Sequence, residues 1–314
     1  MKILFLETGP ETYLIGPAKT GQRNLGIPPG GAADPIAAMI ANRLVGNSPE
    51  TPLIESALLG PTLMTETDIT ACCFGAKFQI RCGEREIPVA QTFVWKSGEI
   101  LKISHCQKYT RIYLAISGGI WEQEMTNVAN QSPSLSLPIH LTPIQKNDHF
   151  FLHSSPVKPS SLRSLQAIAS QELLEEAQIE SPTIHLLPGL QNDWFDNNEF
   201  CQSRFQVHSA SNRLGIRLTG TPIARPQREM VSEAITWGSV QITNEGLPII
   251  VGVGGNTIGG YPKIGQVIQK DLYLLGQLRP HQLVQFKWVT IDQAWQMLEL
   301  QQKKVKNWEI RLIA

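Results

Sequence analysis

The part of the sequence best suited to bind a small molecule is a glycine-rich run at residues 252–260, which Tyr261 and Lys263 follow directly. Small residues let a ligand approach the backbone closely, and free N–H groups at the start of a helix attract anions. The run contains neither a P-loop nor a dinucleotide-binding fingerprint, so an ordinary tight turn is the alternative interpretation. The candidate ligand-binding residues in this region are Asn256, Thr257, Gly259, Gly260, Tyr261 and Lys263.

Two arginines in the same half of the sequence form a second candidate. Arg213 and Arg217 are four residues apart, so an extended strand would place both on one face, where two guanidinium groups can clamp an anion. The alternative is that they pair with surface carboxylates such as Glu229 or Glu233. Ser232 and Glu233 precede Gln241, which lies eight residues beyond Glu233, and these residues are further polar candidates for the same pocket.

A third candidate is a possible metal site at His149 and His153, which share one face of a strand or a helix, with Asp148 beside them. A metal site needs a third close ligand, and 147–148 is more typical of a turn before a short strand. We therefore predict no metal. The sequence also lacks the G-x-S-x-G and H-E-x-x-H patterns of common hydrolases and metalloproteases.

The elements that must position these residues are predicted to be mainly strands. Apolar runs are separated by glycine-rich or polar turns at short intervals, which is typical of barrels and sandwiches rather than of alternating strands and helices. Strands are expected at 1–7, 68–80, 92–94, 99–103, 110–116, 150–152, 213–218, 239–242 and 248–253.

Three helices are expected within the domains, and a polar fourth helix is expected at 165–177 in the segment between them. One begins at Pro35 after Asp34 as N-cap, and a second follows Pro262, where Ile264, Val267, Ile268, Leu272 and Leu275 are three or four residues apart. The third runs from about Ile291 to Lys304, with a capping box formed by Thr290 and Gln293. A Ser/Pro-rich and then polar segment suggests a boundary, so we predict domains at 1–157 and 183–314, joined by a connector at 158–182.

Composition narrows the protein class. The 314 residues include 42% hydrophobic and 17% charged residues, and Lys+Arg and Asp+Glu both number 27. A balanced charge disfavours nucleic acid or membrane surfaces as partners, and no apolar run is long enough to span a bilayer. We expect residues 1–7 to form a first strand rather than a signal peptide, because Glu7 ends the apolar run early, and the five cysteines lack disulfide or zinc spacing. These features predict a cytoplasmic protein with reduced, buried thiols.

Several blocks, in order, resemble one family: the carboxyltransferase-like proteins that include allophanate hydrolase subunit 2 and the C subunit of 5-oxoprolinase. The blocks include LGIPPGGAADP at 25–35, ANRLVGN at 41–47, NRLGIRL at 212–218, GSVQ at 238–241 and GGYPKI at 259–264. The resemblance implies two tandem cyclophilin-like β-barrel domains with a few short helices. It also extends the candidate substrate-binding set to Lys19, Asp34 and Asn212.

The resemblance implies an activity and partners as well. Such proteins form an active cleft with a B-type subunit of similar architecture and, with an A-type subunit, hydrolyse 5-oxoproline to glutamate using ATP. Related complexes hydrolyse allophanate or carboxylate urea from biotin. The chain has neither a biotin attachment sequence nor an ATP-binding motif, so it carries no covalent cofactor, and ATP or biotin would come through partner subunits.

The sequence departs from the family pattern at three places that support an alternative. The family's GSRST falls on ANQSP at 129–133, and the GGxxGR segment expected after it is not found. The family's TVQDLGR falls on 13–19, where only Lys19 keeps a cation, and its DRQTT falls on GGNTI at 254–258. A lost charged hydrogen bond costs about 1.5–3 kcal/mol, enough to affect turnover. The alternative is a catalytically degraded regulatory or scaffold protein, resembling the antagonist of a sporulation kinase inhibitor.

Overall fold

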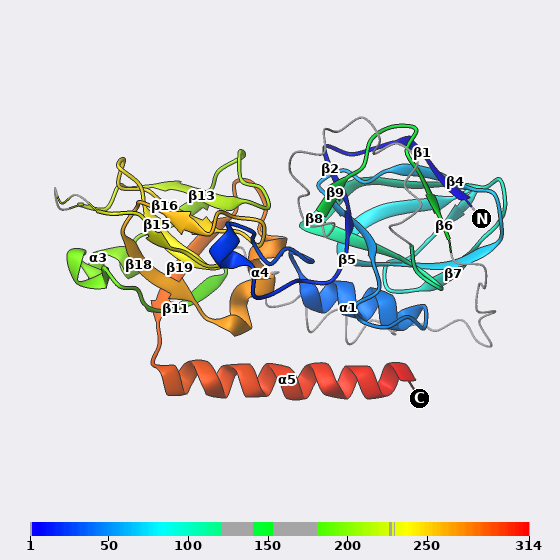
Figure 1. The fold of residues 1–314 in the computed structure, drawn as a ribbon. Helices are drawn as coiled ribbons and strands as arrows, with labels where there is room; N and C mark the ends of the chain where they lie inside the picture. The colour runs from blue at the N-terminus through cyan, green and yellow to red at the C-terminus, as the bar shows by residue number, and fades with distance from the viewer. Residues whose placement is uncertain (1, 121–140, 153–180, 226–227, 229, 314) are drawn as a thin grey trace. The chain divides into compact units, whose positions relative to one another are not determined.

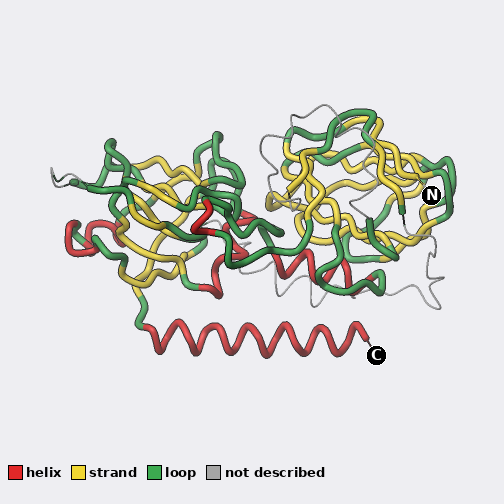
Figure 2. The backbone as a smooth tube through the Cα atoms, in the orientation of Figure 1, coloured by secondary structure: helices red, strands yellow, loops and turns green. Residues whose placement is uncertain are grey.

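The computed structural model describes residues 2–120, 141–152, 181–225, 228 and 230–313. Strands dominate both halves of the chain (Figures 1 and 2), which confirms the predicted mainly β fold. The chain divides into two compact units: unit 1 comprises Met1–Ala18, Pro35–Leu174 and Asn307–Ala314, and unit 2 comprises Lys19–Asp34 and Glu175–Lys306. A short segment early in the sequence is therefore part of the later unit. The connector expected at 158–182 lies almost wholly outside the described residues, and its boundaries stay a prediction.

Unit 1 is a curled, ten-stranded sheet in which β10, β1, β4, β8, β3, β2 and β9 follow one another, and β5 extends it from β8 to β6 and β7. Helix α1 (Pro35–Leu44) packs against β5 and β8 through its buried alanines, Ile40 and Leu44. The strands are β1 (Lys2–Glu7), β2 (Glu11–Ile15), β3 (Leu53–Ala57), β4 (Thr62–Thr65), β5 (Ile69–Cys82), β6 (Arg85–Glu86), β7 (Thr92–Trp95), β8 (Ile100–Ile116), β9 (Leu141–Pro143) and β10 (His149–Phe151).

The curl of unit 1 comes from irregularities in its two longest strands. The pairing of β5 with β8 shifts register after Gly75, whose φ is 122°. A Cβ on Gly75 would lie 2.6 Å from the Arg111 carbonyl oxygen, so only glycine fits there. On β8, Tyr109 has a φ of 62°, and irregularities of this kind bend strands.

Unit 2 contains a closed barrel in the order β11, β18, β15, β16, β13, β12 and β19, which the parallel pairing of β19 with β11 completes. Its interior is a cluster of buried apolar residues that includes Phe200, Phe205 and Phe286. The barrel strands are β11 (Thr183–Pro188), β12 (Phe205–Val207), β13 (Gly215–Gly220), β15 (Ser239–Ile242), β16 (Pro248–Val251), β18 (Lys263–Val267) and β19 (Leu283–Trp288). Two further strands, β14 (Glu233–Ala234) and β17 (Ile258–Gly259), pair only with each other.

The helices of unit 2 are short, except for the last. They are η1 (Arg23–Leu25), η4 (Asn192–Trp194), α3 (Asn197–Gln202), η5 (Gln269–Asp271), α4 (Leu272–Gln277) and α5 (Ile291–Ile313), which continues into unit 1. The predicted capping box of α5 is confirmed: the Thr290 N–H donates to Gln293 Oε1 at 2.9 Å, and the Gln293 N–H donates to Thr290 Oγ1 at 3.2 Å. No helix in the described part of the chain is long and apolar enough to cross a membrane.

Most predicted elements are confirmed, and two are wrong. The helix expected after Pro262 is the strand β18, followed by η5 and α4. Ile264 and Val267 are buried because β18 pairs with both β11 and β15, so their helix-like spacing comes from barrel packing. The strands expected at 99–103 and 110–116 are one continuous strand, β8.

Candidate functional site

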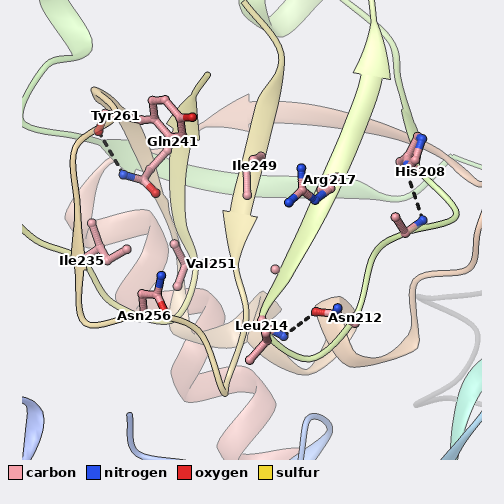
Figure 3. Close-up of a pocket in the computed structure, with 12 residues that line it drawn as sticks. His208, Asn212, Leu214, Arg217, Ile235, Gln241, Ile249, Val251, Asn256 and Tyr261 are labelled. Carbon is pink, nitrogen blue, oxygen red and sulfur yellow. Dashed lines mark hydrogen bonds between the residues drawn. The ribbon is translucent and has the colours of Figure 1, made fainter. Parts of the chain in front are cut away.

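Unit 2 carries a cavity of about 480 Å³ on its barrel wall. Apolar side chains line part of it, and a cation, a histidine and several amides line the rest (Figure 3). The lining residues are His208, Ala210, Asn212, Leu214, Gly215, Arg217, Ile235, Gln241, Ile249, Val251, Asn256 and Tyr261. A concave, mostly apolar site with a few polar groups is typical of small-molecule binding.

The register of the barrel explains why three of these residues meet. Ile249 on β16 is paired with Arg217 on β13 and with Gln241 on β15. Ile216, Leu218, Val240 and Ile242 alternate with them and are buried in the barrel core. Arg217, Ile249 and Gln241 therefore form a row across three adjacent strands, and we call them the row. In Figure 3, Ile249 lies between the guanidinium and the amide.

Arg217 gives the cavity its positive charge. Its side chain is exposed and makes no hydrogen bond or ion pair within the described part of the chain. The backbone is fixed, because the Arg217 N–H donates to Ser211 Oγ at 3.1 Å and the Arg217 carbonyl accepts from the His208 N–H at 2.9 Å. A guanidinium free to make two parallel hydrogen bonds suits a carboxylate.

Gln241 is the buried polar group of the cavity, at 5% exposure. Its Nε2 donates to the Tyr261 carbonyl at 3.0 Å, which fixes the amide and leaves Oε1 as an acceptor. Gly259 makes this arrangement possible, because a Cβ there would lie 2.7 Å from Gln241 Nε2. The close backbone approach predicted for the glycine run therefore occurs here, between Gly259 and a side chain of the protein.

His208 is a lining residue that the sequence analysis missed. Its Nδ1 accepts a hydrogen bond from the Ala210 N–H at 3.1 Å. Since a backbone N–H can only donate, Nδ1 is the acceptor in this hydrogen bond. His208 follows β12 directly, and no pattern in the sequence indicates that it pairs beside Arg217.

Lys263 does not line the cavity. Its Nζ donates to the Ala234 carbonyl at 2.8 Å and lies 3.0 Å from Glu233 Oε1. The Lys263 N–H donates to Gln191 Oε1 at 2.9 Å. The ammonium predicted to meet a substrate therefore fastens β18 to β14, and Glu233 neutralises it.

The predicted arginine clamp is wrong as a pair. The prediction placed both arginines on one face of a single strand. Arg213 precedes β13, which begins at Gly215, so only Arg217 lies on that strand. Arg213 is 4% exposed and donates to the Gly31 carbonyl, whereas Arg217 is exposed in the cavity. Neither pairs with Glu233, and Glu229 lies outside the described residues.

The remaining predicted residues lie apart from the cavity lining. Asp34 is 3% exposed, and its carboxylate accepts a hydrogen bond from Gln277 Nε2 at 2.9 Å. Lys19 is exposed, and its backbone N–H donates to the Pro29 carbonyl. Thr257 is buried, and its carbonyl accepts from the Ile235 N–H at 2.9 Å. Gly260 borders Ser232. Of the twelve candidates, the cavity gathers Asn212, Arg217, Gln241, Asn256 and Tyr261.

The glycine run is not an anion-binding helix start. It leads into β17 and β18, and its N–H groups are used internally: Gly252 donates to the Leu214 carbonyl, Gly254 to that of Arg213 and Gly255 to that of Gly252. The helix expected after the run is absent, so the run serves as a folded connection beside the cavity.

Neither metal chemistry nor thiol chemistry is indicated. No group of three or more metal-binding side chains occurs among residues that the structure describes, and His153 lies outside them. The five cysteines are free thiols, and all except Cys201 are buried. Burial, together with the hydrogen bond to Glu99, raises the pKa of Cys82 to about 12, so this thiol is protonated at neutral pH.

Comparisons with known proteins agree with this architecture. The chain is 30% identical to the C subunit of 5-oxoprolinase from Escherichia coli (strain K12) over 311 residues, which cover 98% of this chain and 97% of that protein. It is 25% identical to urea amidolyase of Saccharomyces cerevisiae over 93% of this chain and 17% of that protein. The solved urea carboxylase of Kluyveromyces lactis superposes with a TM-score of 0.80 at 24% identity, over 98% of this chain and 29% of that chain.

A family model matches residues 25–288, a range that contains both the glycine run and every residue lining the cavity. The match agrees with the ordered sequence blocks and with the barrel that the structure shows. The chain therefore belongs to the carboxyltransferase domain family, subdomain A and B.

Proposed function

We propose that this chain is a subunit of an ATP-dependent complex that opens the cyclic amide of 5-oxoproline to give glutamate, and that its unit 2 cavity holds the substrate. The observation that carries the proposal is the row, which sets an unpaired guanidinium and a fixed amide on either side of an apolar residue. The likeness to the C subunit of 5-oxoprolinase over nearly the whole chain supports the choice of substrate.

The chemistry of the row matches a small cyclic amide with a carboxylate. Arg217 would bind the carboxylate, Gln241 Oε1 would accept the ring N–H, and Ile249 would pack against the ring. The outer strands of the row are about 10 Å apart, two spacings of about 4.8 Å, and the long arginine side chain shortens that gap. This arrangement orients a substrate, and none of its residues is an evident general base. The ring opening consumes one water molecule.

The proposal assigns ATP to a partner. The chain has no ATP-binding motif and no biotin attachment sequence, so we expect ATP, and biotin if the reaction is carboxyl transfer, to be bound through the A-type and B-type subunits of the complex. We place this complex in the cytoplasm, where ATP is available.

Exposed apolar side chains beside the cavity support a partner subunit there. Leu214 is 59% exposed and Ile258 is 60% exposed. Leu214 lines the cavity, and Ile258 lies in β17, between the lining residues Asn256 and Tyr261. Large apolar groups left in water beside a cavity are typical of an interaction surface.

The test is to co-express the chain with its candidate A-type and B-type partners and to measure ATP-dependent glutamate release from 5-oxoproline. Arg217→Gln should raise KM by about 10- to 100-fold, because a charged hydrogen bond contributes about 1.5–3 kcal/mol. Arg225→Gln is the matched control, since Arg225 bonds to Asn244 and does not line the cavity.

The outcomes separate the two interpretations of the family resemblance. A well-formed complex without glutamate release would refute the enzymatic proposal and favour the regulatory or scaffold alternative. If Arg217→Gln leaves turnover unchanged, the substrate binds elsewhere.

A further inference from the structure

One wall of the cavity is separate from the barrel. We call β14, β17 and the residues beside them (233–235 and 256–261) the flap. Its two strands pair only with each other. Three flap residues, Ile235, Asn256 and Tyr261, line the cavity, and in Figure 3 they lie at the Gln241 end of the row, away from Arg217. The shape of the cavity therefore depends on where the flap lies.

Few contacts hold the flap in place. Inside it, the Ile235 N–H donates to the Thr257 carbonyl at 2.9 Å. From the barrel, Gln241 donates to the Tyr261 carbonyl, and Lys263 Nζ donates to the Ala234 carbonyl at 2.8 Å. Ile235 and Thr257 are the buried residues of the flap, and its other residues are partly or fully exposed. Elements with few buried apolar contacts and partly exposed hydrogen bonds open easily.

Another cation reaches the flap from far away in the sequence. Arg23 Nη2 donates to the carbonyl of Ile235, 212 residues later in the chain. Consecutive flap carbonyls, those of Ala234 and Ile235, thus each accept from a different cation. The hydrogen bonds that charged donors make are stronger than those of neutral donors.

Arg23 is held by a segment that is itself fixed. It belongs to residues Lys19–Asp34, which are part of unit 2. At the far end of this segment Arg213 donates to the Gly31 carbonyl and Gln277 to Asp34, in both cases from buried side chains. A Cβ on Gly276 would lie 2.4 Å from the Ala33 carbonyl oxygen, so the segment and α4 touch.

We propose that Arg23 is a positioning residue for the cavity: it holds Ile235, and with it the flap, beside the Gln241 end of the row, without touching the ligand. This inference rests on the proposed function for its ligand, but the position of the flap can be measured without one. Loss of Arg23 would loosen one wall of the cavity and leave Arg217, Ile249 and Gln241 in place on the barrel.

The experiment compares hydrogen–deuterium exchange of the full chain with that of Arg23→Ala, Arg23→Lys and the control Asn24→Ala. Asn24 is exposed, lies beside Arg23 in η1 and makes no hydrogen bond or ion pair to the flap within the described part of the chain. Arg23→Ala should speed exchange in peptides of 233–237 and 256–261 by roughly 5- to 30-fold, with β15 and β16 unchanged. Arg23→Lys should restore part of the protection, because lysine can still donate to one carbonyl.

Affinity for 5-oxoproline, measured by calorimetry on the assembled complex, completes the test. Arg23→Ala should weaken binding by roughly 5- to 30-fold and Asn24→Ala should not. Unchanged flap exchange, or an equal rise across the whole barrel, would overturn the inference, because Arg23 would then have no role or only a general structural one.

The two proposals can fail separately. If the wild-type complex does not bind 5-oxoproline while Arg23→Ala loosens only the flap, the positioning role stands and the proposed substrate fails. If Arg217→Gln weakens binding while Arg23→Ala changes neither exchange nor affinity, the proposed function stands and the positioning role fails.

Discussion

Replacing Gly259 with alanine tests how closely the glycine run fits the cavity. The added Cβ would lie 2.7 Å from Gln241 Nε2 and 3.0 Å from Ile235 Cδ1. Real Cβ atoms do not approach another heavy atom as closely as 2.7 Å, so the Gln241 amide must shift, and we expect it to lose its hydrogen bond to the Tyr261 carbonyl. Gly259 has no left-handed φ, so the alanine itself causes no backbone strain.

The expected cost follows from these contacts. Overpacking a tight site costs about 1–3 kcal/mol, and the lost hydrogen bond costs about 0.5–1.5 kcal/mol. Alanine also restricts the unfolded chain, which offsets about 0.4–1 kcal/mol. We expect Gly259→Ala to lower the free energy of unfolding of unit 2 by about 1–3 kcal/mol net. We also expect it to raise KM for 5-oxoproline, because Gln241 no longer faces the substrate.

Gly254→Ala is the matched control in the same run. Its Cβ would meet only ordinary contacts, at 3.6 Å to Leu214 Cδ2 and 3.7 Å to the Arg213 carbonyl oxygen. We expect it to be neutral or to stabilise by up to about 1 kcal/mol. Urea unfolding and steady-state kinetics measure both effects. Equal stability and equal KM in the two variants would refute the argument that Gly259 is glycine because of Gln241.

Three further predictions concern other parts of the molecule. Lys263→Met should destabilise unit 2 by about 1–3 kcal/mol in urea unfolding, because it leaves Glu233 without its cation. It should also speed hydrogen–deuterium exchange in the flap, and unchanged exchange there would contradict the structural role of Lys263. The N–H of Lys96, with smaller effects from its neighbours, lowers the pKa of Glu99, so this carboxylate stabilises the fold above the unfolded-state pKa of about 4.3 and the benefit is lost as pH falls. Glu99→Gln should therefore lower the melting temperature at pH 7, and the gap to wild type should narrow as pH falls below about 4.3 and through the lower folded-state pKa. A gap that stays constant as the pH falls would count against this assignment. Iodoacetamide at pH 8 should modify Cys201 before any other described cysteine, because it alone is not buried, and peptide mass spectrometry would reveal a different order.

Much of the architecture could be predicted from local pattern. Alternating apolar residues predicted the strands at 239–242 and 248–253, and the structure has β15 and β16 there. The capping signals at Asp34-Pro35 and at Thr290 with Gln293 predicted the starts of α1 and α5. These signals are readable because the atoms that interact are within a few residues of one another.

The site depended on contacts that no local pattern contains. Gln241 and Tyr261 were predicted individually, but the row exists only because β16 lies between β13 and β15 in one register. His208 was missed because its place beside Arg217 comes from the pairing of separate strands. Ile264 and Val267 suggested a helix, since burial on a barrel strand with two neighbours can imitate helical spacing.

The charged residues show the division most clearly. The sequence shows that four of these residues are cations, namely Arg23, Arg213, Arg217 and Lys263. Their positions in the sequence suggested that Arg213, Arg217 and Lys263 meet a substrate. Tertiary structure gave three of the four backbone carbonyls of unit 2 and left Arg217 exposed in the cavity. A cation's role depends on which partner lies within hydrogen-bonding distance, and the fold brings those partners from as far as 212 residues away.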